Sequence, residues 1–114
     1  MPIDKLMVGA RIRKIREEMF EESRNEFAVR CNLAERYVGQ VERGEFIPSL
    51  NALDKIKKST GVDVDFILYG KNEKTKLNIR NNLHSIIDNA NNDELKVYYK
   101  CITTIKGYVN KNKN

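Results

Sequence analysis

The 114-residue sequence has no tryptophan, a single histidine, two cysteines and two prolines. Cys31 and Cys101 are isolated and lack the spacing of metal ligands, so we expect two reduced thiols packed as small apolar side chains. His84 has no second ligand candidate near it in the sequence, which favours a surface position on a helix. No metal ion or cofactor is therefore expected.

Long apolar runs are also missing. No run approaches the roughly 18 residues that a bilayer-spanning helix needs, and the N-terminus lacks the apolar core of a signal peptide. A cytoplasmic protein without a membrane partner is expected. The sequence also holds no Ser-His-Asp set, no paired carboxylates in a glycine-framed cleft and no phosphate loop, so an enzyme is not expected.

Net charge is absent from residues 1–70, where 12 Lys and Arg balance 12 Asp and Glu. The whole formal excess of +5 lies in residues 71–114, which hold 9 basic and 4 acidic residues. A nucleic-acid-binding domain without net charge must concentrate its positive groups locally. Any argument for nucleic-acid binding therefore rests on a motif and not on bulk charge.

Residues 23–48 carry such a motif, because they read as two short helices joined by a tight turn. Ser23 and Glu26 have the spacing of a capping box, and Asn32 can adopt the left-handed conformation of a helix end. Gly44 stops the second helix, expected over about 34–43, and Pro48 prevents its simple continuation. The outward-facing residues of this second helix are Glu35, Arg36, Tyr37, Gln40 and Arg43.

Apolar periodicity predicts an all-α protein of seven helices. Five of them fall in residues 1–70, at about 5–20, 23–32, 34–43, 49–60 and 63–69. A polar stretch at 71–75 is the expected linker. Two further amphipathic helices follow within residues 76–114.

The last helix carries an apolar stripe with spacings of three, four, three and four residues, typical of a helix that packs along a partner helix. Two amphipathic helices alone bury too little surface to fold stably. We expect a second copy of the chain as the partner, although a different protein would suit the same stripe. The stripe consists of Leu95, Tyr98, Ile102, Ile105 and Val109.

The segment from Val8 to Gly70 resembles the phage-repressor/Cro type of helix-turn-helix domain, also called the xenobiotic-response-element family. The resemblance lies in the sequence IRKIR of the first helix, in ERG followed by Pro48-Ser49-Leu50, and in the ending GVDVDFIL. It implies a five-helix domain of a bacterial or phage transcriptional regulator that binds operator DNA as a dimer. The loop at 19–22 departs from the pattern, because it is longer than usual and lacks the customary glycine.

By position in this family, Glu35, Arg36 and Gln40 are the base-edge readers, with Tyr37 beside them. The chemistry agrees, since Arg can donate two hydrogen bonds to guanine, Gln can pair with adenine, and a carboxylate can accept from cytosine. The alternative for Arg36 and Gln40 is a solvated helix face. For Glu35 the alternative is a capping or surface acid near the helix N-terminus.

Other positions would hold the protein on DNA without reading its sequence. Arg24 matches a phosphate contact of the family, and Arg43 and Asn51 are further candidates for backbone contacts. Arg16 and Glu42 match a family ion pair between the first and third helices, which would orient the reading helix.

The sequence therefore predicts a dimeric repressor that binds a palindromic operator in double-stranded DNA. A protein-interaction module, such as an antitoxin or the partner of an antirepressor, is the alternative. In that case the C-terminal helices would bind a different protein.

Overall fold

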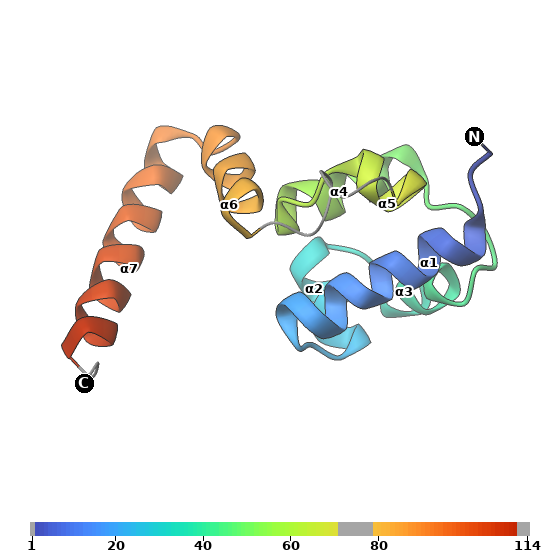
Figure 1. Ribbon diagram of the computed structural model, residues 1–114, viewed down its shortest axis with the longest axis horizontal. Coiled ribbons are helices and arrows are strands. Elements are labelled where there is room, and N and C mark those ends of the chain that lie inside the picture. The colour runs from blue at the N-terminus through green and yellow to red at the C-terminus, as the bar shows by residue number, and fades with distance from the viewer. Residues whose placement is uncertain (1, 71–78, 112–114) are drawn as a thin grey trace.

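The computed structural model describes residues 2–70 and 79–111, and within these ranges it contains helices and no strand. The predicted all-α class is confirmed, whereas the predicted linker at 71–75 lies outside the described residues. Figure 1 shows the arrangement. The elements in chain order are α1 (Lys5–Lys14), η1 (Ile15–Phe20), α2 (Arg24–Cys31), α3 (Glu35–Glu42), α4 (Leu50–Thr60), α5 (Val64–Tyr69), α6 (Ile79–Asp88) and α7 (Asn92–Lys111).

Local signals set most helix boundaries where the sequence predicted them. The Ser23 hydroxyl accepts a hydrogen bond from Glu26 N at 3.1 Å, and the Glu26 carboxylate accepts one from Ser23 N at 2.8 Å, so the predicted capping box is confirmed. Asn32 ends α2 with φ of 56° and Gly44 follows α3 with φ of 74°. Both residues thus adopt the left-handed conformation that closes a helix. These short-range interactions set where α2 begins and where α2 and α3 end.

The first helix differs from its prediction in its last two turns. Residues 5–20 are helical as expected, but η1 is a π-helix and not a continuation of α1. It ends at Glu21, which has a left-handed backbone with φ of 51° although it is not a glycine. A π-helical segment accommodates an additional residue within a helix. The unusually long loop at 19–22 is thus absorbed in part by the helix that precedes it.

A single apolar core joins α1 through α5. Its fully buried members are Val8, Ile12, Ile15, Phe27, Ala28, Cys31, Val38, Val41, Leu53, Ile56, Val62 and Ile67. α1 crosses so close to the end of α3 that any side chain at Gly9 would collide with the backbone oxygens of Val41 and Glu42. Arg11 reaches across the core to donate hydrogen bonds to Ile67 O and Leu68 O at 3.1 and 3.2 Å. This arrangement fixes α3 on the body of the protein.

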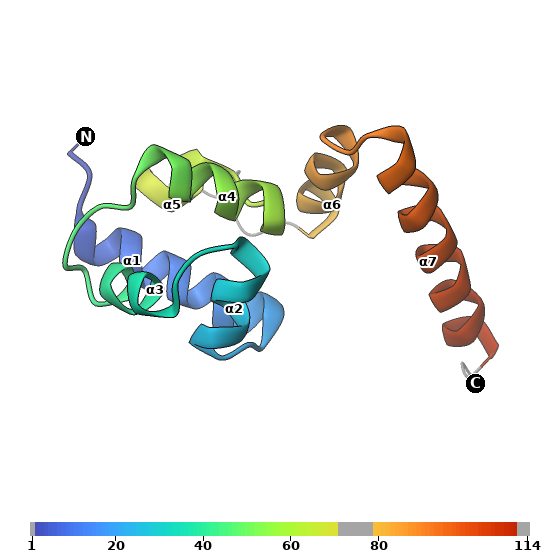
Figure 2. The same cartoon turned by 180° about the vertical axis from the view of Figure 1, so that it is seen from behind.

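The two C-terminal helices lie at one end of the molecule. α6 packs against α4, where the backbone of Asn82 lies so close to Gly61 that a side chain at Gly61 would collide with it. A capping box precedes α7, because Asn91 Oδ1 accepts from Glu94 N at 2.8 Å and Glu94 Oε1 accepts from Asn91 N at 3.0 Å. Figure 2, from behind, also shows α7 extending away from the other helices.

Candidate nucleic-acid interface

The outer face of α3 is polar and its inner face is apolar. Val38 and Val41 are each only 2% exposed, so they fasten the helix to the core. Glu35 and Arg36 at the start of α3 are exposed, and Gln40 one turn further on is half-buried. Because α2 braces α3 across the turn at Asn32, this polar face is presented on a rigid support.

Arg36 and Gln40 are the polar side chains of this face that are left available. Within the described residues, neither side chain makes an ion pair or a hydrogen bond. They are four residues apart, which places them on the same side of a helix. A guanidinium group with five donors and an amide with both a donor and an acceptor are thus directed to one surface.

Glu35 is held in place by the preceding helix. Asn25 Nδ2 donates a hydrogen bond to Glu35 Oε1 at 2.9 Å. The bond links the first turn of α2 to the first turn of α3 and restricts the carboxylate. Sequence reasoning missed Asn25 because nothing in the sequence signals a side-chain contact across ten residues.

Tyr37 has a different position from the one predicted. Its ring is half-buried, with its centroid 5.4 Å from that of Phe46. Its hydroxyl oxygen accepts a hydrogen bond from Ser49 N at 2.9 Å. Tyr37 therefore braces the loop that leads from α3 into α4, and its predicted base contact stays a prediction.

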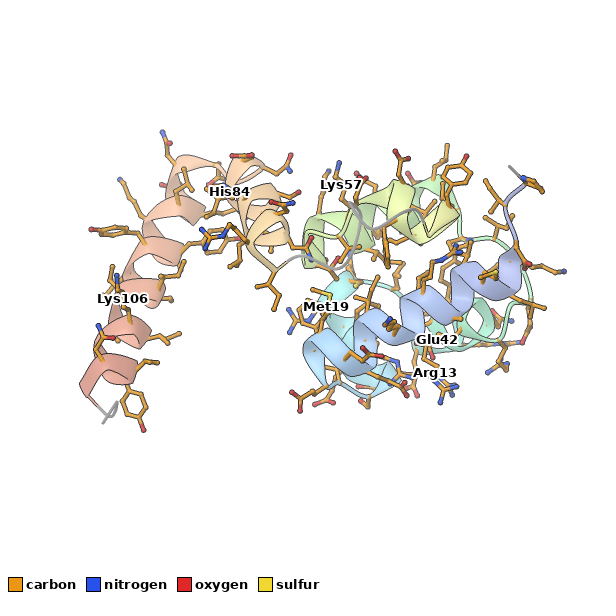
Figure 3. The ribbon with its side chains drawn as sticks, in the orientation of Figure 1. Arg13, Met19, Glu42, Lys57, His84 and Lys106 are labelled. Carbon is orange, nitrogen blue, oxygen red and sulfur yellow. The ribbon has the colours of Figure 1, made fainter. Side chains whose placement is uncertain are left out.

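Glu42 lies at the centre of a charged network where α1 and α3 pack together (Figure 3). Its side chain is 1% exposed, and its carboxylate accepts from Arg16 Nε at 2.7 Å and from Arg16 Nη2 at 3.0 Å. Arg24 Nε donates to the same carboxylate at 3.0 Å. Burial would raise the pKa of Glu42, but the hydrogen bonds and charges of the two arginines outweigh it, so the pKa is lowered. The carboxylate therefore stays ionised and links η1, α2 and α3.

A surface depression follows the polar face of α3. Arg24, Glu35, Arg36, Gly39 and Arg43 line it. A side chain at Gly39 would bring its Cβ to 3.0 Å from Arg43 Nη1, so the glycine leaves room for this guanidinium group over the helix. Arg43 Nε also donates to Glu45 Oε2 at 2.8 Å. The structure thus brings three arginines around one hollow, two of them already paired with carboxylates.

Asn51 lies apart from this hollow, on the exposed first turn of α4. It borders a second depression that includes Asn32, Tyr37, Ser49 and Lys55. Lys55 Nζ donates to Asn32 O at 3.2 Å. Lys55 was absent from the predicted site, although its place four residues after Asn51 put it on the same face of a helix.

Two of the four acidic side chains in η1 and directly after it form ion pairs with arginines. Glu17 pairs with Arg13 at 3.1 Å, and Glu22 pairs with Arg30 at 2.7 Å. The Arg30 guanidinium also lies 4.2 Å from the centre of the Phe20 ring, a cation–π geometry. Arg30 therefore holds Glu22 and packs on Phe20, and it does not contribute to the polar face of α3.

No metal site is evident in the part of the chain that the structure describes, since no group of three His, Cys, Asp or Glu residues could hold an ion there. His84 is exposed on α6, Cys31 is buried and Cys101 is exposed. Over the same residues, no helix is both long and apolar enough to cross a membrane.

A helix with a free polar face, braced across a tight turn by the helix before it, defines the helix-turn-helix class of DNA-binding proteins. Control protein C.BamHI of Bacillus amyloliquefaciens is 33% identical to this chain over 76 residues, which cover 63% of this chain and 94% of that protein. The chain therefore belongs to the phage-repressor/Cro-type, or xenobiotic-response-element, family of helix-turn-helix transcriptional regulators. No family model and no solved structure matches it. More than a third of the chain lies outside the alignment with C.BamHI.

Proposed function

We propose that the protein is a dimeric repressor that binds a palindromic operator through α3. One observation carries this proposal. Of the four arginines on α2, on α3 and at the end of α3, three pair with carboxylates, whereas Arg36 has no such partner among the described residues. A guanidinium group left free on a braced, exposed helix is suited to an external ligand.

The chemistry of the reading face suits base edges in the major groove. Arg36 can donate two hydrogen bonds to guanine, and Gln40 can both donate to and accept from adenine. Glu35 can accept from a cytosine amino group if its bond to Asn25 allows. Each good bidentate pair contributes roughly 1–3 kcal/mol of discrimination between bases.

Phosphate contacts would place α3 in the groove. Arg24 uses its Nε to bind Glu42, so its terminal nitrogens remain available to a phosphate group. Arg43 borders the same hollow, and Asn51 lies at the N-terminus of α4, where backbone N–H groups favour anions. In this arrangement Arg16 and Glu42 act indirectly, because they orient the helix and Arg24.

Dimerisation through residues 76–109 would supply the second reading helix. Ile102, Ile105 and Val109 are more than half exposed on α7, as expected for side chains that await a partner. Leu95 and Tyr98 are half-buried. Two copies of α3 about one helical turn of DNA apart, roughly 34–36 Å, would occupy both half-sites and block polymerase.

The test is a footprint on the DNA upstream of the protein's own gene. The double variant Arg36→Ala/Gln40→Ala should weaken specific binding by at least about 30-fold, because two bidentate pairs of roughly 1–3 kcal/mol each are lost even at a single half-site. Arg13→Ala is the matched control, since Arg13 is an exposed arginine on α1 already paired with Glu17. Specific binding that survives the double variant unchanged would refute the assignment of α3.

The alternative function is a protein-interaction module, favoured by the same exposed apolar side chains on α6 and α7. Light scattering on the purified chain separates the two. A monomer that binds no DNA but pairs with a different protein would support the interaction module.

A further inference from the structure

α7 lies apart from the rest of the described chain. It has 20 residues and is about 30 Å long. Its C-terminal half, here called the far half, lies beside no other described helix in either Figure 1 or Figure 2. The radius of gyration is 15.5 Å, whereas a compact chain of this length has about 13 Å. A helix without tertiary contacts is only marginally stable in water, so α7 requires a partner.

The apolar face of α7 is wider than a contact with one helix requires. By their spacing along the helix, Val97, Cys101 and Tyr108 extend the stripe on one side, and Lys106 borders it on the other. At about 100° per residue, the apolar arc spans about 160°, whereas a two-stranded coiled coil uses a narrow seam. Tyr108 on this flank is 70% exposed. The arc therefore has room for two neighbouring helices.

α6 presents a second unpartnered apolar stripe. Ile79, Leu83 and Ile87 are 68, 49 and 40% exposed and line a surface depression. This stripe is separate from the side of α6 that packs on α4, where Asn82 meets Gly61. With 10 residues, α6 is about 15 Å long and can cover only half of α7. The α6 helix of the same chain therefore cannot cover the far half of α7.

We propose that the α6 and α7 helices of two copies assemble into a four-helix bundle, in which α6 of each copy covers the far half of α7 of the other. The inference rests on the proposed dimer. The exposed area fits a second copy, because the contributing side chains expose roughly 800 Å², about what each partner buries in a standard interface. These side chains are Ile79, Leu83, Ile87, Val97, Ile102, Ile105, Tyr108 and Val109.

Sedimentation equilibrium of full-length variants tests the bundle. Leu83→Ser on α6 and Ile105→Ser on α7 should each raise the dimer dissociation constant by about 100-fold, because each dimer loses the apolar side chain twice. Val29→Ser is the matched control, since Val29 is 74% exposed on α2, away from both helices. It should leave the dissociation constant unchanged. Circular dichroism establishes that each variant is folded, and Leu83→Ala replaces Leu83→Ser if the latter unfolds.

The outcomes separate the bundle from the dimer itself. If Ile105→Ser dissociates the dimer and the Leu83 variants do not, α7 pairs with its copy as a two-stranded coiled coil. That outcome refutes the bundle and leaves the proposed dimer in place. A dimer unaffected by both substitutions places the interface elsewhere and also overturns the bundle. A wild-type chain that stays monomeric when bound to its operator refutes the proposed dimer, and a stable complex with a different protein through Leu83 assigns this surface to that protein.

Discussion

Replacing Glu42 with alanine removes the centre of the charged network between the first helix and the reading helix. Glu42 is 1% exposed and receives hydrogen bonds from both Arg16 and Arg24. The two arginines differ in what they lose. Arg16 is 8% exposed, whereas Arg24 is 40% exposed and can be rehydrated when the carboxylate is gone. The cost of the substitution therefore comes mainly from Arg16.

The magnitude follows from this difference. Removing one partner of a buried ion pair costs about 3–5 kcal/mol, because it leaves an uncompensated buried charge. Arg16 keeps a hydrogen bond from Nη1 to Glu22 O at 2.8 Å and an ion pair with Glu17 at 3.7 Å, which place the expected loss at the lower end. We expect Glu42→Ala to lower the free energy of unfolding by about 3 kcal/mol.

Urea unfolding at a fixed chain concentration measures the loss. The midpoint should fall by roughly 1–3 M, given the usual urea dependence for a small protein. Glu45→Ala is the matched control, because the pair of Glu45 with Arg43 is exposed and such pairs contribute at most about 1 kcal/mol. Equal midpoints for the two variants would show that the buried network does not stabilise the fold as reasoned here.

The same substitution should weaken operator binding, because Arg24 and α3 lose their common support. Gel shifts under conditions where the variant stays folded should show weaker binding to specific DNA and little change with unrelated DNA. Unchanged operator affinity would mean that the network does not position the reading helix.

Three further predictions concern the left-handed residue Glu21, the pH dependence of the Glu42 network and the two thiols. Glu21→Gly should stabilise the protein by roughly 0.5–1 kcal/mol in thermal unfolding, because glycine relieves the left-handed backbone at φ of 51°; Glu21→Ala, which keeps that strain, should bring no such gain. The pKa of Glu42 is lowered in the folded protein, so the ionised carboxylate contributes its full stabilisation above the ordinary pKa of 4.5 and loses it as pH falls through the lower folded-state pKa. The urea midpoint of the wild type should therefore fall more steeply in acid than that of Glu42→Gln, and parallel curves would contradict this. Burial raises the pKa of Cys31 to about 11, so a thiol reagent should modify Cys101 rapidly in the native protein and Cys31 only after unfolding; equal rates for both would show that Cys31 is accessible.

The features that could be predicted from the sequence are those that depend on neighbouring residues. The capping boxes at Ser23 and Asn91, and the helix ends at Asn32 and Gly44, are set by hydrogen bonds and backbone preferences over a few residues. Apolar periodicity likewise predicted the helical segments of residues 1–70, although Leu50, which the same periodicity places inward, is 84% exposed. These short-range rules were sufficient for the helix order and the turn before α3.

Side-chain positions that depend on packing could not be predicted in the same way. The sequence places Tyr37 on the outward side of α3, yet the loop that follows brings Phe46 and Ser49 against it. The π-helical end of the first helix had a signal in the long loop at 19–22, but periodicity alone does not distinguish it from a regular helix. The phosphate contact of Arg24 stays a prediction by position, whereas its bond to Glu42 follows from the packing of α2 against α3.

The length of α7 beyond its own neighbours has a consequence for gene control. If operator reading requires two chains, and each chain completes its C-terminal helices only with a second copy, then occupancy follows the number of dimers. At concentrations below the dimer dissociation constant, doubling the amount of chain raises the number of dimers roughly fourfold. A gene controlled by such a protein would respond weakly to the first molecules made and sharply once enough had accumulated. The projecting helix α7 would thus delay the response until the chain concentration approaches the dimer dissociation constant.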